Sequence, residues 1–263
     1  MHIKTILAAS AAVIISAASA QAAEVAALTG DNTISIVDTS KKAVTKTWKI
    51  EGVAGKVLGI DVRPADGMMY AVGAEGGIYT VDMKTGKATM KSKLDKTGDT
   101  KWATAKVTVD FNPAADRLRV MANDGTSLRI NVDDGKVTVD GSHKFAEGDM
   151  HKGEKPNIVA GAYTNSFKGT KETTLYNIDA TIGGLIKQAP PNDGTLNAVG
   201  KLGPKVDTVA FDIWSDGQGK NEAWLMSGDT LYSVDLASGK ATMAAKIAGA
   251  KGTVRDIAIL PAM

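Results

Sequence analysis

The sequence predicts an all-β protein that folds as a five-bladed β-propeller. Three observations support this fold class: one strand-turn-strand motif occurs five times, no long helical periodicity is present, and an unpaired strand is left over at the C-terminus. Self-similarity with a period of about 40–50 residues is typical of propeller blades. A sandwich of two flat sheets is the alternative, and the repeat argues against it.

Each copy of the motif is an alternating apolar strand that ends in an Asp step, followed by a glycine-containing turn and a second strand. The copies are SIVDTSKKAVT, YTVDMKTGKATM, RINVDDGKVTV, LYNIDATIGGLI and LYSVDLASGKATM, with reference aspartates Asp38, Asp82, Asp133, Asp179 and Asp235. Alternation on both sides of such a turn predicts a β-hairpin. We expect these aspartates to brace the turns through backbone hydrogen bonds rather than to catalyse.

A second strand-turn-strand element precedes each hairpin, which gives four strands per blade. Its clearest forms are VLGIDVRPADGMMYAVG from Val57 and VTVDFNPAADRLRVMAN from Val107. The first repeat lacks this leading strand, and VRDIAILP from Val254 resembles it. We therefore expect the C-terminal strand to complete the N-terminal blade and close the ring, which removes the exposed sheet edges.

Residues 1–20 have the pattern of a signal peptide: Lys4 precedes an apolar stretch, and small residues allow cleavage after Ala20 or Ala22. The stretch is shorter than the ~18–20 residues that span a membrane, so we expect no membrane anchor. Residues 24–263 then form a single propeller domain. The prediction is a periplasmic or extracellular protein, present as a monomer.

The composition limits the classes of function. There is no cysteine, which excludes disulfides, thiolate metal sites and a cysteine nucleophile. Lys+Arg 31 nearly balances Asp+Glu 29, so nucleic acid is not expected as a partner. Neither a nucleophile elbow nor a phosphate-binding glycine loop before a helix is present.

Five segments of the chain resemble one family of exported bacterial repeat proteins that is catalogued as a domain of unknown function. The segments are DFNPAADRLRV, LRINVDDG, AYTNS, TTLYNID and PPNDGTLNAVGKLG. The resemblance covers nearly the whole chain after residue 20, although Met121 replaces the usual second aliphatic residue of a signature strand. It implies a propeller-like fold and export, and it implies no reaction, cofactor or catalytic residue.

Acidic residues on the expected innermost strands form the candidate site, because these strands surround the channel of a propeller. We align the expected innermost strands, which are GIDVRP, TVDFNP, GAYTN, TVAFDI and DIAILP. In this alignment Asp61 and Asp110 match Ala162, Ala210 and Ala258. Two residues further on, Arg63, Asn112, Thr164, Asp212 and Leu260 match one another. Asp61, Asp110, Asp212, Arg63 and Asn112 are the candidate ligand-binding residues, together with Trp214 at a strand end.

Three other features of the sequence give less evidence for a functional site. His143 and His151 lie in HKFAEGDMHKGEKPN, a polar stretch that we expect to be an exposed loop and a weak candidate for a metal site. The run from Ala189 to Gly194 is expected to connect blades four and five. Trp224 lies in an apolar strand and is expected in the core.

The sequence therefore predicts a binding scaffold for a small molecule, a glycan or a protein, without a required cofactor and more readily than an enzyme. Two alternatives remain open. Paired carboxylates on inner strands also occur in five-bladed glycosidases, where they act as acid and as base or nucleophile. The same oxygens suit a hard cation such as Ca²⁺.

Overall fold

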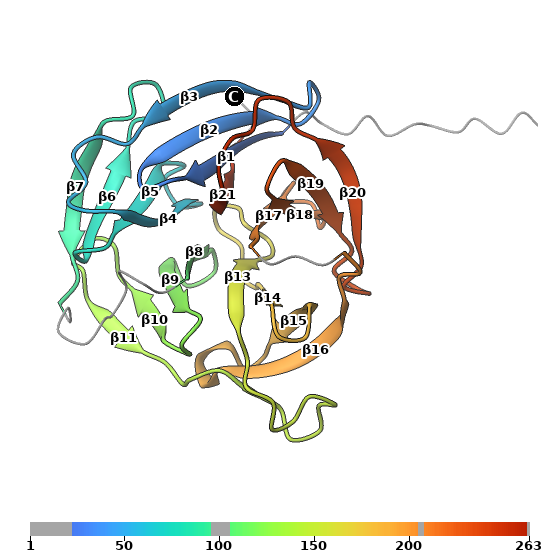
Figure 1. The fold of residues 1–263 in the computed structure, drawn as a ribbon. Coiled ribbons are helices and arrows are strands. Elements are labelled where there is room, and N and C mark those ends of the chain that lie inside the picture. The colour runs from blue at the N-terminus through green and yellow to red at the C-terminus, as the bar shows by residue number, and fades with distance from the viewer. Residues whose placement is uncertain (1–22, 96–105, 205–207, 262–263) are drawn as a thin grey trace, which may run out of the picture.

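The computed structural model describes residues 23–95, 106–204 and 208–261, which form five antiparallel sheets around a central axis (Figure 1). The predicted signal peptide lies outside the described residues. From the innermost strand outward, blade one contains β21 (Val254–Ile259), β1 (Glu24–Thr29), β2 (Thr33–Asp38) and β3 (Ala43–Lys49), and blade two contains β4 (Val57–Val62), β5 (Met69–Gly73), β6 (Gly77–Val81) and β7 (Ala88–Lys93). Blade three contains β8 (Val107–Asn112), β9 (Arg117–Ala122), β10 (Ser127–Ile130) and β11 (Val137–Val139), and blade four contains β13 (Ile158–Tyr163), β14 (Leu175–Asp179), β15 (Gly184–Gln188) and β16 (Thr195–Lys201). Blade five contains β17 (Ala210–Ser215), β18 (Asn221–Ser227), β19 (Thr230–Val234) and β20 (Ala241–Lys246). The predicted five-bladed propeller is confirmed.

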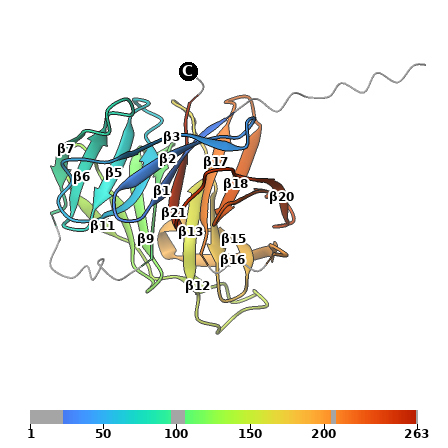
Figure 2. The same cartoon turned by 45° about the horizontal axis from the view of Figure 1, so that its top comes forward.

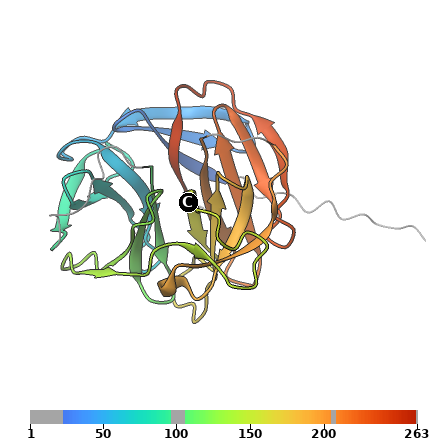
Figure 3. The ribbon, with the colours of Figure 1, turned by 60° about the horizontal axis from the view of Figure 1, so that its bottom comes forward.

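The C-terminal strand closes the ring, as the leftover strand predicts. β21 pairs antiparallel with β1, with Val25 opposite Ile259 and Ala27 opposite Ile257. The two strands lie side by side from every angle in Figures 1 to 3. The first and last strands of the fold thus share one sheet, and blade one has four strands only because β21 joins it.

Burial decreases from the axis outward. Every residue of β4 and β13 is buried, whereas β3 and β7 are mostly exposed. Inner strands are flanked by two neighbouring blades, and the core consists of apolar clusters between blades; one of them joins blades two and three through Tyr70 and Phe111. Residues on both faces of β4 and β13 are therefore buried.

The predicted turn braces are present in three blades at the turn between the third and fourth strands. Asp82 Oδ1, for example, accepts hydrogen bonds from the backbone N–H groups of Lys84 and Thr85 at 2.7 and 3.2 Å. Asp38 and Asp235 do the same.

In blade three the choice of Asp133 is wrong. Asn131 occupies the brace position, because its carbonyl accepts the bond from Gly135 as that of Asp82 does from Gly86.

Blade four departs from the predicted repeat. Asp179 also braces a turn, but this turn joins the second and third strands of the blade. The motif therefore lies one strand earlier in blade four than the repeat predicts. The run from Ala189 to Gly194 lies inside the blade, between β15 and β16, and contains the 3₁₀ helix η1 (Pro191–Asp193). An Asp followed by a tight turn is compatible with any hairpin of the blade. This signal alone therefore does not show which two strands the turn connects.

A fifth strand extends blade four at its outer edge. β12 (Lys144–Phe145) pairs parallel with β16, and Phe145 and His143 are buried. The start of the segment that contains the two histidines is therefore part of a sheet edge, whereas residues 147–155 form mostly exposed turns, as the composition predicts. Within the described ranges, no helix is long and apolar enough to cross a bilayer.

Candidate binding site at the channel mouth

Aspartates on four of the five innermost strands link neighbouring blades. Each carboxylate accepts a hydrogen bond from a backbone N–H group of the next inner strand around the ring. The bonds run from Phe111 N to Asp61 Oδ2 (2.6 Å), from Tyr163 N to Asp110 Oδ1 (3.0 Å), from Ile259 N to Asp212 Oδ2 (2.6 Å) and from Ile60 N to Asp256 Oδ2 (2.9 Å). Inner strands make no sheet hydrogen bonds to one another, so these carboxylates satisfy backbone donors that face the channel.

Asp61, Asp110 and Asp212 converge in one layer. One carboxylate oxygen from each lies within 4.8 Å of the others. The predicted register of β17 is wrong by two residues, because Asp212 aligns with Asp61 and not with Arg63. Both carboxylates make the same pair of bonds, one to the next residue of their own strand and one to the neighbouring strand.

The sequence alone did not identify Asp256 as a channel residue. It lies on β21 and bonds to Ile60, which places it one layer deeper in the channel than Asp61. The side chain is 2% exposed. The signal was present in VRDIAILP, but the alignment matched Ala258 with the other aspartates and left Asp256 without an equivalent.

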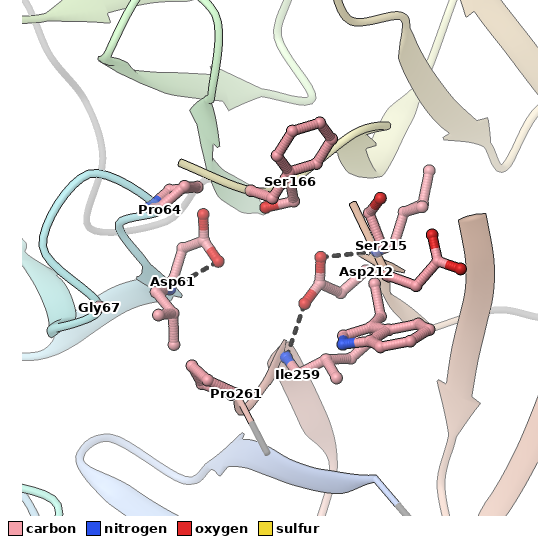
Figure 4. A pocket seen from close by; sticks show the side chains of 13 residues that line it. Asp61, Pro64, Gly67, Ser166, Asp212, Ser215, Ile259 and Pro261 are labelled. Atoms are coloured by element: carbon pink, nitrogen blue, oxygen red, sulfur yellow. Dashed lines mark hydrogen bonds between the residues drawn. The ribbon is translucent and has the colours of Figure 1, made fainter. Parts of the chain in front are cut away.

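A cavity of about 360 Å³ opens beside the carboxylates. In Figure 4 the carboxyl groups of Asp61 and Asp212 face the same space, with Ser166 and Pro261 on other sides. Phe167 and Trp214 add aromatic surface to its wall. The lining includes Asp216 as a third acid and no lysine, arginine or histidine, so the cavity is acidic.

Burial raises the pKa of all four carboxyl groups. The pKa of Asp212 rises to about 6. For Asp61 burial is again the main cause, and the charge of Asp212 adds to it. The pKa of Asp110 rises through burial and through the charges of Asp61 and Asp212. Backbone N–H donors oppose these shifts only in part, so the cluster retains protons well above the usual range of aspartic acid.

Asp110 differs from its two neighbours in one respect. Its Oδ1 holds the N–H of Tyr163, whereas Oδ2 accepts no hydrogen bond from any residue that the structure describes. A carboxylate oxygen that accepts no hydrogen bond keeps its lone pairs for a proton or a cation. This oxygen is therefore the best-placed ligand atom of the cluster.

Arg63 does not point into the channel. Its guanidinium bonds to Asp116 at 2.6 and 2.8 Å, to Asp133 at 3.0 Å and to the hydroxyl of Tyr70 at 3.2 Å. Asp116 and Asp133 belong to blade three and Arg63 to blade two. The prediction of a ligand-binding role for Arg63 finds no support in this position, which is that of a clamp between blades.

Replacing Arg63 with methionine is expected to lower the free energy of unfolding by about 2 kcal/mol, because it leaves two partly exposed carboxylates and Tyr70 without their partner. Urea unfolding measures this change. Lys91→Met serves as the control, since Lys91 makes only an exposed pair with Asp133, and its loss should cost less than about 1 kcal/mol. Equal losses of stability in the two variants would show that the contacts of Arg63 between blades add no more stability than one exposed ion pair.

The two remaining predicted site residues have different surroundings. Asn112 is the last residue of β8, and its Oδ1 accepts hydrogen bonds from Ala114 and Ala115, so it starts a turn. Trp214 is half-buried, packs against the apolar cluster between blades five and one, and lines the cavity. Trp224 packs against the same cluster, in agreement with its predicted core position.

Neither histidine belongs to a group of metal-ligating side chains in the described part of the chain, where Asp61, Asp110 and Asp212 form the one such group. His151 pairs with Glu154 at 3.0 Å and lies against Phe145. Burial and the charge of Arg119 lower the pKa of His143 to about 4, and its Nε2 has no hydrogen-bond partner. His143 is thus a neutral core side chain.

A family model described as "Domain of unknown function (DUF4394)" matches residues 33–258. The chain belongs to this family. The matched range extends from β2 to β21 and contains all four channel aspartates. No curated protein matches the chain significantly.

Two solved structures are similar to the chain. A protein of unknown function from Bacteroides thetaiotaomicron is 18% identical, with a TM-score of 0.52 over 92% of this chain and 65% of that one. A protein of unknown function from Bacteroides caccae is 13% identical, with a TM-score of 0.46 over 92% of this chain and 100% of its own. At such identities the first match supports the fold alone.

Proposed function

We propose that this DUF4394 propeller is a binding scaffold that holds a hard divalent cation of the Ca²⁺ type at its acidic channel mouth. The observation that carries the proposal is the convergence of Asp61, Asp110 and Asp212 beside an open, acidic cavity. Oxygen atoms of carboxylates are the ligands that Ca²⁺ prefers in proteins.

The geometry supports a cation in three ways. The backbone N–H donors orient Asp61 and Asp212 and use one lone pair of each oxygen, which leaves the others for an ion. Oδ2 of Asp110 is available in full. No cationic side chain lines the cavity, so an ion would meet no competing charge.

The cavity is larger than an ion requires. Its volume of about 360 Å³ lies in the range of pockets for small organic ligands. We infer that an ion at the carboxylates shares this space with oxygen atoms of a second ligand, a glycan or another small molecule, whose apolar part contacts Phe167 and Trp214. The predicted signal peptide is consistent with a role outside the cytoplasm.

Glycoside hydrolysis fits this arrangement less well. Acid and base carboxyls in glycosidases are ~5–9.5 Å apart and need separate pKa values. Here three carboxylate oxygens lie within 4.8 Å of one another, and burial raises the pKa of all three groups. We therefore favour binding over catalysis.

Ca²⁺ should raise the thermal midpoint of the full-length chain, by the equivalent of about 2.7 kcal/mol at a hundred times its Kd. Asp110→Asn is the sharpest variant, because the amide oxygen can keep the bond to Tyr163 while the unpaired carboxylate oxygen is lost. We expect this variant to bind Ca²⁺ about 10–100-fold more weakly.

Asp82→Asn is the matched control, since Asp82 braces an exposed turn far out on blade two. It should respond to Ca²⁺ as the wild type does. A midpoint that Ca²⁺ leaves unchanged, or an equal response of Asp110→Asn and Asp82→Asn, would refute the proposal.

A further inference from the structure

The opposite end of the channel contains a second cavity of different chemistry. Its volume is about 260 Å³, and residues at or next to the first residue of all five inner strands line it. The lining residues are Lys56, Leu58, Lys106, Val107, Val159, Thr208, Val209, Thr253 and Arg255. Lys56 precedes Asp61 by five residues of extended chain, so the two cavities lie roughly 16 Å apart along the axis.

This second cavity is basic. Three cationic side chains from three blades line it, and none of the acidic residues that the structure describes does so. Lys56 makes no ion pair with any residue of the described ranges. Two threonines, Thr208 and Thr253, add hydroxyl groups that can donate hydrogen bonds.

Arg255 is held in place by backbone and not by a carboxylate. Nε donates to the carbonyl of Gly30 at 2.6 Å, and Nη2 donates to those of Asp31 and Val57 at 3.0 and 2.8 Å. Nη1 donates no hydrogen bond within the part of the chain that the structure describes. Burial lowers the pKa of Arg255, with the charges of Asp256 and Asp31 opposing this shift. The guanidinium is thus oriented, partly desolvated and left without a salt bridge.

We propose that this basic mouth binds a small oxyanion, a phosphate or carboxylate group, between Lys56 and Arg255. Arg255 supplies the N–H groups of Nη1, which its contacts with backbone hold in place, and Lys56 supplies a mobile charge from the neighbouring blade. Asp256 lies deeper in the channel, where burial raises its pKa and so disfavours the charged form that would repel an anion. This site is separate from the acidic mouth and does not depend on the proposed cation.

Calorimetric titration of the full-length chain with inorganic phosphate tests the proposal, with sodium chloride added to constant ionic strength. The wild type should bind phosphate saturably. Lys56→Gln should weaken binding about tenfold, and Lys56→Arg should restore most of it. Lys240→Gln removes the same charge from an exposed turn of blade five and should bind as the wild type does.

Two further measurements make the result specific. Thr253→Val should weaken binding without a change of charge, which separates a built site from general electrostatic attraction. Asp110→Asn should leave phosphate binding unchanged, so failure of the cation proposal and failure of this one are distinguishable. Binding that is not saturable, or that is equal in Lys56→Gln and Lys240→Gln, would overturn the proposal.

Discussion

Replacing Arg119 with methionine is expected to lower the free energy of unfolding by about 3–5 kcal/mol, the largest effect of any single change that we predict. The Arg119 side chain is 1% exposed and makes a salt bridge to Asp140 at 2.9 Å. It also donates to the Tyr163 hydroxyl at 2.6 Å, to Ser127 at 2.8 Å and to Asn192 at 2.8 Å.

The loss is large because methionine fills the space but leaves buried acceptors without a donor. Arg129 also pairs with Asp140 and limits the cost at that carboxylate. Equilibrium unfolding in urea gives the change directly. Arg117→Met is the matched control on the same strand, since Arg117 bonds only to backbone carbonyls at the surface and its loss should cost about 0.5 kcal/mol or less. Similar losses of unfolding free energy in both variants would contradict the claim that the buried hydrogen bonds of Arg119 stabilise the fold.

The second large effect is a dependence of stability on pH that originates in the channel. The folded state raises the pKa of Asp212 from 3.8 to about 6, so between these values the native protein binds more protons than the unfolded chain. Its contribution to stability is full below about pH 4 and is lost as pH rises through 6. The loss amounts to about 3 kcal/mol for two pKa units.

The difference between wild type and Asp212→Asn isolates this contribution, measured by urea unfolding from pH 4 to 8 with a chelator present. We expect the wild type to lose stability relative to the variant as pH rises. Asp82→Asn should give an almost flat difference across this range, because backbone hydrogen bonds lower the pKa of Asp82 and its stabilisation is lost mainly below about pH 4. A difference curve for Asp212 that is flat across this range would show that the carboxylate is not desolvated.

The sequence predicts the architecture better than the positions within it. Five recurrences of one hairpin motif and an unpaired C-terminal strand are enough to specify the closed ring. The strand number within blade four is not specified, because an Asp-braced turn suits either of two connections in a blade, as Asp179 shows. Register along β17 fails for a related reason: shifting an alternating strand by two residues keeps every side chain on the same face.

The candidate site was predicted in part for physical reasons that particular residues illustrate. Asp61 and Asp110 lie on strands with clear alternation, and the structure places them together. Arg63 follows the end of β4 and Asn112 is the last residue of β8, so alternation no longer determines where their side chains point. Arg63 instead meets carboxylates of another blade, a contact that local sequence does not encode.

Two of the five sequence segments that carry the family resemblance meet in the structure. Arg119 lies in the DFNPAADRLRV segment and Asn192 in the PPNDGTLNAVGKLG segment, and their side chains are joined by a hydrogen bond of 2.8 Å. This bond connects blades three and four. These two residues thus contribute to stability, whereas Asp110 at the start of the first segment belongs to the proposed binding site.

Calorimetric titration of Ca²⁺ at pH 6, in two buffers of different ionisation enthalpy, tests the central claim most directly. The proposed site must lose protons when the cation binds, because burial raises the pKa of Asp61, Asp110 and Asp212. We predict saturable binding with proton release, weaker at lower pH and largely lost in Asp110→Asn. Heats that show no binding, or binding without proton release that Asp110→Asn leaves intact, would contradict a cation site at the channel mouth.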